Sequence, residues 1–235
     1  FSYWVSEAII KPFVNPALGT VLTTREGMAT AGNDRFLRNW FEIPINEILF
    51  NCNNSVEALQ SGYKWFPYNK GGDYRKWYGN NELVVNWYND GFEIRNNIDL
   101  ETGRIRSHNY NGSFGFREGI TWSSISAGDI SVRYSESGFL FDSKGAKGFC
   151  DDSQKLLFIQ ALLNSKVSKE YLKIFSPTMD FKVGDIILIP LYHEIFDNEK
   201  IQSLSSELVS TSRIDWDSSE TSWDFSKHPL LNGTT

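Results

Sequence analysis

The side chains best suited to chemistry lie between residues 64 and 78, where cations alternate with aromatic rings. From Lys64 to Lys76, four Lys or Arg side chains stand against Asp73, which gives this stretch a net charge of +3. A cation beside a flat ring suits a nucleic acid, because the cation meets the phosphates and the ring meets exposed bases. The alternative is a set of core rings with solvated cations at their rim. The spacing alone leaves both interpretations open.

A second candidate segment, Gly27–Phe36, consists largely of small residues and ends in Asn-Asp-Arg-Phe. Such a loop exposes backbone N–H groups and places Arg35 beside them, which suits a phosphate oxygen. Further cations, Arg104 and Arg106, stand in the loop-like region 96–112. For these two, contact with DNA and an ordinary solvated connection are both open.

Charge is distributed unevenly along the 235 residues, whose net charge is −6. Residues 1–150 hold 15 Lys or Arg and 16 Asp or Glu, a net of −1, whereas residues 151–235 hold 8 and 13, a net of −5. The first part is therefore free to present a basic face. No apolar run reaches ~18 residues and no signal peptide is visible, so we expect a soluble, cytoplasmic protein without a membrane partner. The first residue, Phe1, indicates a piece of a longer chain.

Hydrophobic periodicity and turn signals predict an α+β fold, a twisted and mainly antiparallel sheet with flanking helices. The expected helices are 3–11, 153–164, 169–175 and 199–209, the first ending at Pro12 and the second capped by a box that begins at Asp151. Strands are expected at 20–24, 40–44, 82–88 and 181–190, with a three-stranded antiparallel meander at 119–123, 130–134 and 139–142. Pro67 and the Gly71-Gly72 pair predict a loop over 64–81.

Several blocks of the sequence resemble one family. K-W-F-P-Y-N-K-G-G-D-Y-R-K-W-Y-G-N-N-E, followed by V-V-N-W, resembles the block after the catalytic domain in PglX-type adenine-specific DNA methyltransferases of BREX phage-defence systems. The blocks E-G-I-T-W-S, S-V-R-Y-S, G-F-L-F-D and D-W-D-S-x-E-T-S-W-D-F are similar to the same family. Gly27–Phe36 resembles the first loop of recognition domains in N6-adenine methyltransferases. The run from L-L-N-S-K-V to D-I-I-L-I-P resembles the end of such domains, including type I specificity subunits.

This resemblance implies the C-terminal target-recognition region of an adenine-specific methyltransferase of restriction–modification or phage defence, with a TaqI-like or type I specificity-like fold. Residues 1–195 would form the recognition domain, and residues 196–235 a helix and an acidic tail. Trp216 and Trp223 in that tail would contact another part of the parent. The implied partners are double-stranded DNA, the parent's catalytic domain and other defence proteins. The residues predicted to contact DNA are Arg25, Thr30, Asn33, Arg35, Lys64, Lys70, Arg75, Lys76, Tyr78, Arg117 and Arg133.

The motifs of the methyl transfer itself are missing from the sequence. S-adenosylmethionine needs a glycine-rich strand–turn–helix, and the target amine needs a polar-Pro-Pro-aromatic motif; neither occurs. The three histidines are scattered, and Cys52 and Cys150 lack Cys-x-x-Cys spacing. We therefore predict no catalytic, cofactor-binding or metal-binding residue in this chain. The cofactor would belong to the parent's catalytic domain.

Two alternatives remain open at this point. Trp65, Trp77, Trp87 and Trp122 on a β-scaffold with an acidic balance would suit a carbohydrate-binding module, in which rings stack on sugars. A stand-alone specificity subunit that serves other chains would keep the DNA partner and change only the assembly.

Overall fold

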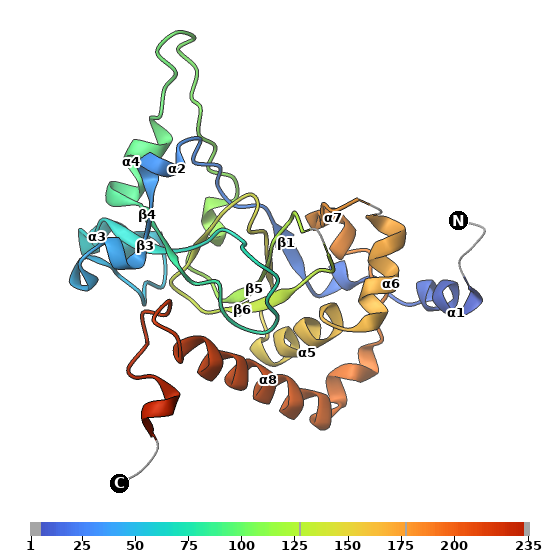
Figure 1. Ribbon diagram of the computed structural model, residues 1–235. Coiled ribbons are helices and arrows are strands. Elements are labelled where there is room, and N and C mark those ends of the chain that lie inside the picture. The colour runs from blue at the N-terminus through green and yellow to red at the C-terminus, as the bar shows by residue number, and fades with distance from the viewer. Residues whose placement is uncertain (1–5, 127, 177, 233–235) are drawn as a thin grey trace.

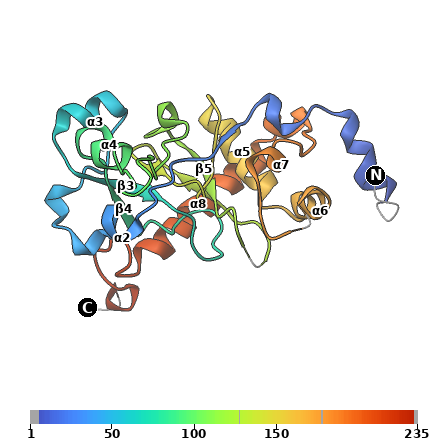
Figure 2. The same ribbon diagram turned by 90° about the horizontal axis from the view of Figure 1, so that it is seen from above.

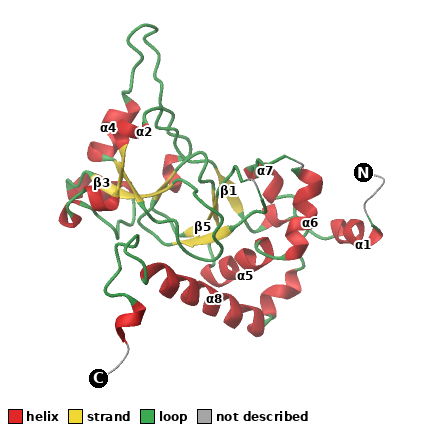
Figure 3. Ribbon diagram, viewed as in Figure 1, coloured by secondary structure: helices red, strands yellow, loops and turns green. Residues whose placement is uncertain are grey.

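The computed structural model describes residues 6–126, 128–176 and 178–232. It confirms the α+β class and the mainly antiparallel pairing, with two four-stranded sheets where the sequence predicted one (Figures 1 and 3). The first sheet is antiparallel throughout, in the order β1 (Thr23–Arg25), β8 (Lys147–Phe149), β5 (Gly119–Trp122) and β6 (Val132–Ser135). The second has the order β2 (Leu37–Asn39), β4 (Leu83–Asn86), β3 (Trp65–Asn69) and β7 (Leu140–Phe141). Its β3–β7 pair is parallel and its other pairs are antiparallel.

Helices gather around each sheet (Figures 1 and 2). Around the second sheet lie α2 (Asn33–Phe36), α3 (Ser55–Ser61) and α4 (Tyr88–Arg95). Beside the first lie α5 (Ser153–Leu163), α6 (Lys166–Phe175) and α7 (Val183–Ile186), and the long α8 (Glu199–Asp217) packs against α5. The short α1 (Glu7–Ile10) lies near the N-terminus.

Each sheet has its own hydrophobic core. The core of the first sheet joins Ile120 and Trp122 of β5 to the buried stripe of α5, which includes Leu156 and Ile159. The core of the second joins Phe36 of α2 to residues of β3, β4, α3 and α4. Both cores are built from side chains far apart in sequence, so the positions of surface residues depend on how these layers pack.

Helix capping explains where the confirmed helices begin. The Asp152 side chain accepts the backbone N–H groups of Gln154 and Lys155, so the cap of α5 is Asp152 and not the predicted Asp151. Ser165 caps α6, which begins at Lys166, three residues before the predicted start at 169. The last helix, α8, continues to Asp217 instead of ending at 209, and therefore takes up part of the predicted tail.

Two predicted strands are wrong, each for a physical reason. Residues Trp40–Glu42 form a 3₁₀ turn instead of a strand, because Asn39 and Glu42 make a reciprocal capping box. Within 181–190 the chain forms α7 instead of a strand, since a short apolar run reads alike for a buried helix and a buried strand. The first α-helix ends at Ile10, just before Pro12 and close to the predicted end, and a separate 3₁₀ helix, Lys11–Val14, follows it through the proline. The predicted positions 3–5 lie outside the described residues.

The predicted meander is half correct. Strands β5 and β6 form the expected antiparallel hairpin. The third strand leaves it: Gly138, with φ +94°, turns the chain so that β7 joins the second sheet in parallel with β3. A Cβ at Gly138 would lie 2.0 Å from the carbonyl oxygen of Phe50, so this turn requires glycine.

The predicted loop over 64–81 is wrong in its first part, because the segment begins as a strand and becomes a loop only after Asn69. Its first part is β3, in which Pro67 lies between the Trp65–Ile48 bridge and the start of the β7 pairing at Tyr68. Among the described residues, no strand pairs with residue 67 on that side of β3, so a proline, which has no N–H to donate, is tolerated there. Farther along, Trp77 forms a parallel bridge with Arg133, and its backbone pairs with β6.

The most exposed feature of the outline is a hairpin of residues 96–107, which we call the projecting hairpin. It extends well away from α4 at the top of Figure 1. Its two arms meet at an antiparallel bridge between Ile98 and Ile105. The tip closes through a hydrogen bond from the Gly103 N–H to the Asp99 carbonyl, with Gly103 at φ +68°.

Candidate nucleic-acid interface

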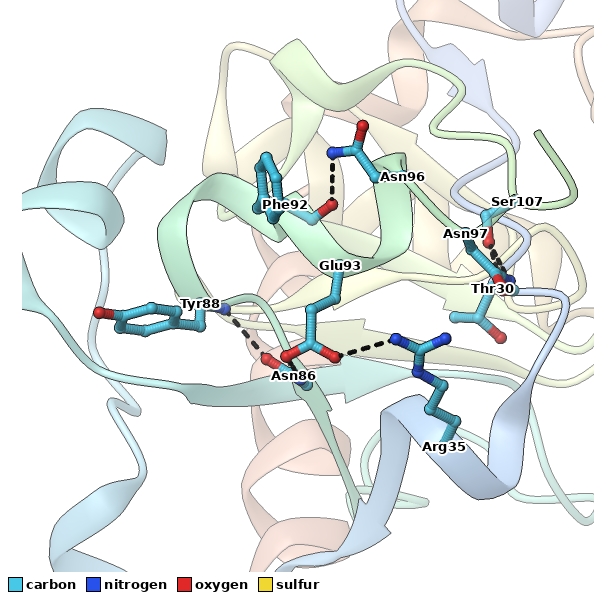
Figure 4. Close-up of polar contacts among 9 residues, drawn as sticks. All are labelled: Thr30, Arg35, Asn86, Tyr88, Phe92, Glu93, Asn96, Asn97 and Ser107. Carbon is cyan, nitrogen blue, oxygen red and sulfur yellow. Dashed lines mark hydrogen bonds and ion pairs between the residues drawn. The ribbon is translucent and has the colours of Figure 1, made fainter. Parts of the chain in front are cut away.

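The Gly27–Phe36 segment is hydrogen-bonded to the base of the projecting hairpin (Figure 4). Thr30 is buried, and its hydroxyl donates to the Asn33 side chain at 3.0 Å. Its carbonyl accepts from the Ser107 hydroxyl at 2.5 Å and from the Asn97 amide at 3.3 Å. Asn97 also donates to Ser107 at 2.9 Å. Thr30 is thus a fixed support, and Asn33 is held at its side through the bond between their side chains.

A second set of contacts ties α2 to α4 (Figure 4). Arg35 Nη2 lies 3.4 Å from Glu93 Oε2, and Asn86 Nδ2 donates to the other carboxylate oxygen at 3.3 Å. The Arg35 side chain is 60% exposed, so this ion pair is weak and open to solvent. Tyr88 and Phe92 of α4 also expose their rings, and the Tyr88 ring points away from this ion pair in Figure 4.

Lys70 lies in a hollow of ≈ 540 Å³ beside α2, which Asn33 and Arg38 also line. Burial lowers the pKa of Lys70, and the carboxylates of Asp142 and Asp34 partly offset that effect. Lys64 is exposed and lies 5.4 Å from the ring of Trp65, while Arg38 lies 6.0 Å from the same ring.

Arg38 belongs with the predicted cations, although sequence reasoning missed it. It carried no motif signal, because its position depends on β2 pairing with β4 at one side of the second sheet. Lys64, Arg38, Lys70, Asn33 and Arg35 are thereby distributed over α2, β2 and the two ends of β3. We call these five residues, with the exposed rings of Tyr88 and Phe92, the α2–α4 face.

Arg25 and Arg117 form a separate pair. Their guanidinium carbons lie 4.9 and 5.2 Å from the centroid of the Phe114 ring. Arg25 also donates to the Thr24 carbonyl at 2.8 Å, and Arg117 pairs with exposed Asp151 at 3.2 Å. The structure brings these two cations together at β1 and the loop before β5.

The remaining predicted residues face inward, between the first sheet and α8. Arg133 is 1% exposed, and Tyr78 is also buried. Burial lowers the pKa of Arg133 to about 10, and nearby Arg75 adds to the decrease. Lys76 donates to the carbonyl of Asn164 at 2.8 Å, just after the end of α5. These contacts stabilise the fold.

Arg75 is the centre of this internal group. Its Nε donates to the Tyr78 carbonyl at 2.9 Å, and its Nη2 lies 2.6 Å from Asp215. Its guanidinium lies 5.0 Å from the ring of Trp216, which is 7% exposed. Trp223 contacts Phe50, with ring centroids 5.0 Å apart. The expectation that Trp216 contacts another part of the parent is therefore corrected, because its ring is buried within this chain, whereas the same expectation for the half-buried Trp223 stays a prediction.

Burial also bears on the carbohydrate-binding alternative. Trp65, Trp87 and Trp122 are all buried, and Trp77 is half-buried with its backbone fixed against β6. Three of the four rings that would stack on a sugar are therefore buried in the core and cannot reach one.

Among the described helices, none has the length and apolar character needed to cross a membrane.

Comparison with known proteins places this geometry in context. No protein-family model matches the sequence. The chain is 47% identical over 232 residues to the adenine-specific methyltransferase PglX of Lacticaseibacillus casei (strain Zhang), covering 98% of this chain and 19% of that protein. It is 37% identical over 235 residues to the adenine-specific methyltransferase BrxX of Escherichia coli O9:H4 (strain HS), covering 98% and 18%. The chain spans about a fifth of the length of these curated relatives, and over nearly its whole length it is homologous to that part of the PglX and BrxX adenine-specific methyltransferases.

Proposed function

We propose that this chain is the DNA target-recognition part of an adenine-specific DNA methyltransferase of phage defence, C-terminal to the catalytic part. The observation that carries the proposal is the 47% identity, over 98% of the chain, to about a fifth of a protein named as an adenine-specific methyltransferase. The sequence lacks the motifs for cofactor binding and for holding the target amine. A division of labour follows: the rest of the parent binds S-adenosylmethionine and transfers the methyl group, and this part positions the DNA.

The α2–α4 face is the best candidate for the surface that meets DNA. It combines four cations with exposed aromatic rings, and its rigid base is set by the buried contacts of Thr30. The loose pair of Arg35 with Glu93 leaves the guanidinium able to turn to a phosphate, because an exposed ion pair contributes ~1 kcal/mol or less. Asn33 offers a side-chain amide for a phosphate or a base edge.

The net charge of −6 is compatible with this assignment because the acidic last third contributes −5 of it. Of the helices in that third, α8 carries a net charge of −2 and lies on the side away from the projecting hairpin in Figure 1, whereas α5 and α6 carry +1 and +2. The pair of Arg25 and Arg117 would extend the contact with the DNA phosphates along the first sheet. A target-recognition fold of the TaqI or type I specificity class is part of the same proposal.

Fluorescence anisotropy with labelled duplex DNA at several salt concentrations tests the proposal. Each lost phosphate contact lowers the slope of log affinity against log salt by roughly 0.9. The double variant Arg35→Ala/Lys70→Ala should therefore reduce the slope by about 2. The control Lys155→Ala/Lys200→Ala on α5 and α8 should leave it unchanged. Failure of the unaltered chain to bind duplex DNA at low salt would refute the proposed function.

A further inference from the structure

The projecting hairpin has no core of its own, yet its base is firmly fixed. The exposed apolar side chains are Leu100 at the tip, 98% exposed, and Ile98 and Ile105 on the two arms. At its base Asn97 and Ser107 bond to Thr30, and His108 exchanges two backbone hydrogen bonds with Ala29. The arms therefore hold their direction although little of the hairpin is buried.

The chemistry of the hairpin differs between its parts. Arg104 and Arg106 are exposed on the returning arm. On the outgoing arm the Asp99 carboxylate turns back and accepts the N–H groups of Glu101 and Thr102 at 3.0 and 2.9 Å. The bonds to Thr102 and then to Glu101 lower the pKa of Asp99. The two cations, the apolar tip and the exposed Glu101 carboxylate beside it are thus the groups that are available to a partner.

We infer that the projecting hairpin enters the major groove of the duplex, with Leu100 at the base edges and Arg104 and Arg106 on the groove wall. This inference rests on the proposed function and names the element that reads the DNA. The major groove, roughly 12 Å wide, admits a two-stranded ribbon, and the thymine methyl group lies there as an apolar contact for a side chain such as leucine. Arginine serves both phosphates and guanine edges.

The shared base makes this arrangement mechanically consistent. Thr30 joins the base of the hairpin to the Gly27–Phe36 segment, which also carries Asn33 and Arg35 (Figure 4 shows Thr30, Asn97, Ser107 and Arg35). A hairpin placed in the groove would therefore bring the α2–α4 face towards the adjacent phosphates. Phosphate contacts by that face would fix the register in which the hairpin reads the bases.

The test uses two variants of the 235-residue chain. In the first, the tip residues 100–103 are replaced by Asn-Gly, a two-residue turn that suits an antiparallel hairpin and keeps the Ile98–Ile105 bridge. The second is Arg104→Ala/Arg106→Ala. The same assay with Lys155→Ala/Lys200→Ala provides the matched charge control. Because all altered side chains in the hairpin lie at the surface, the melting temperature of each variant should equal that of the unaltered chain.

Binding to a duplex that contains the parent's methylation site should weaken about tenfold or more in each hairpin variant. Methyl green, which occupies the major groove, should compete with the unaltered chain, and netropsin, which occupies the minor groove, should not. Unchanged affinity in both variants, with normal binding by the unaltered chain, would overturn the inference and leave the proposed function in place. The inference is also overturned if the hairpin variants bind DNA normally and instead lose association with the parent's catalytic part. Absence of duplex binding by the unaltered chain would overturn both.

Discussion

Replacing Arg75 with alanine should destabilise the fold and leave the salt dependence of DNA binding unchanged. The sequence predicted Arg75 as a phosphate partner, because it stands in the basic, aromatic stretch. In the structure its side chain is 28% exposed and lies between the loop after β3 and α8. A group already bonded on several sides would have to break internal contacts before it reached a phosphate.

The expected loss follows from the contacts of Arg75. A hydrogen bond from a charged donor contributes ~1.5–3 kcal/mol, and the bond to the Tyr78 carbonyl at 2.9 Å is of this kind. The ion pair with Asp215 contributes ~1 kcal/mol or less, since that carboxylate is 72% exposed. The contact with the Trp216 ring contributes ~0.5–1 kcal/mol. Together these contacts predict a decrease of ~2–5 kcal/mol in the free energy of unfolding.

Arg35→Ala is the matched control, because the same substitution there should give the opposite result. The Arg35 pair with Glu93 is long and exposed, so the free energy of unfolding should change by less than ~1 kcal/mol. The slope of log affinity against log salt should instead fall by roughly 0.9. Urea unfolding followed by tryptophan fluorescence gives the first quantity, and anisotropy with duplex DNA gives the second. A stable Arg75→Ala variant with a reduced salt slope would refute this reasoning.

Three further predictions concern the interior. Burial lowers the pKa of Lys147 to about 7 from 10.5, so the folded state binds fewer protons than the unfolded state between those pH values and stability rises with pH across that range. The buried Lys147 Nζ has no hydrogen-bond partner among the described residues, so Lys147→Met should raise the free energy of unfolding at pH 7 by ~2–4 kcal/mol. The variant should also show a flatter pH dependence of stability, which urea unfolding from pH 7 to 10 would measure. Gly79→Ala should cost more than ~3 kcal/mol, because a Cβ there, at φ +119°, would lie 2.5 Å from Arg75 Nε. The control is Gly62→Ala, at φ +69° with no described atom within 4 Å of its Cβ, which should cost ~1 kcal/mol. If denaturant unfolding gave the same loss of unfolding free energy for both variants, the close packing of Gly79 against Arg75 would be contradicted. Trp216→Ala should lower the free energy of unfolding by ~3 kcal/mol, and an unchanged melting temperature would show that the ring is not part of this fold.

Local signals in the sequence determined the elements that depend on few neighbours. Capping residues and an apolar stripe located α5, and a Ser-Ala-Gly-Asp turn between alternating segments located the β5–β6 hairpin. The quoted blocks also indicated the relatives that the comparisons found. These features can be predicted because a cap, a turn or a stripe is set within a few residues of the chain.

Only the tertiary structure decided which cations are available to a partner. Arg75 and Arg35 are the same residue type in segments with similar signals, yet one is held by α8 and the other lies open to solvent. The contact of Arg75 with Asp215 joins positions 140 residues apart, and the transfer of β7 to the second sheet depends on a close approach to Phe50. Such contacts arise from the packing of whole layers, and a side chain's own neighbours in sequence carry no record of them. The exposure of a charged residue is therefore a property of the assembled fold, whereas its presence in a helix or strand is largely a property of its local sequence.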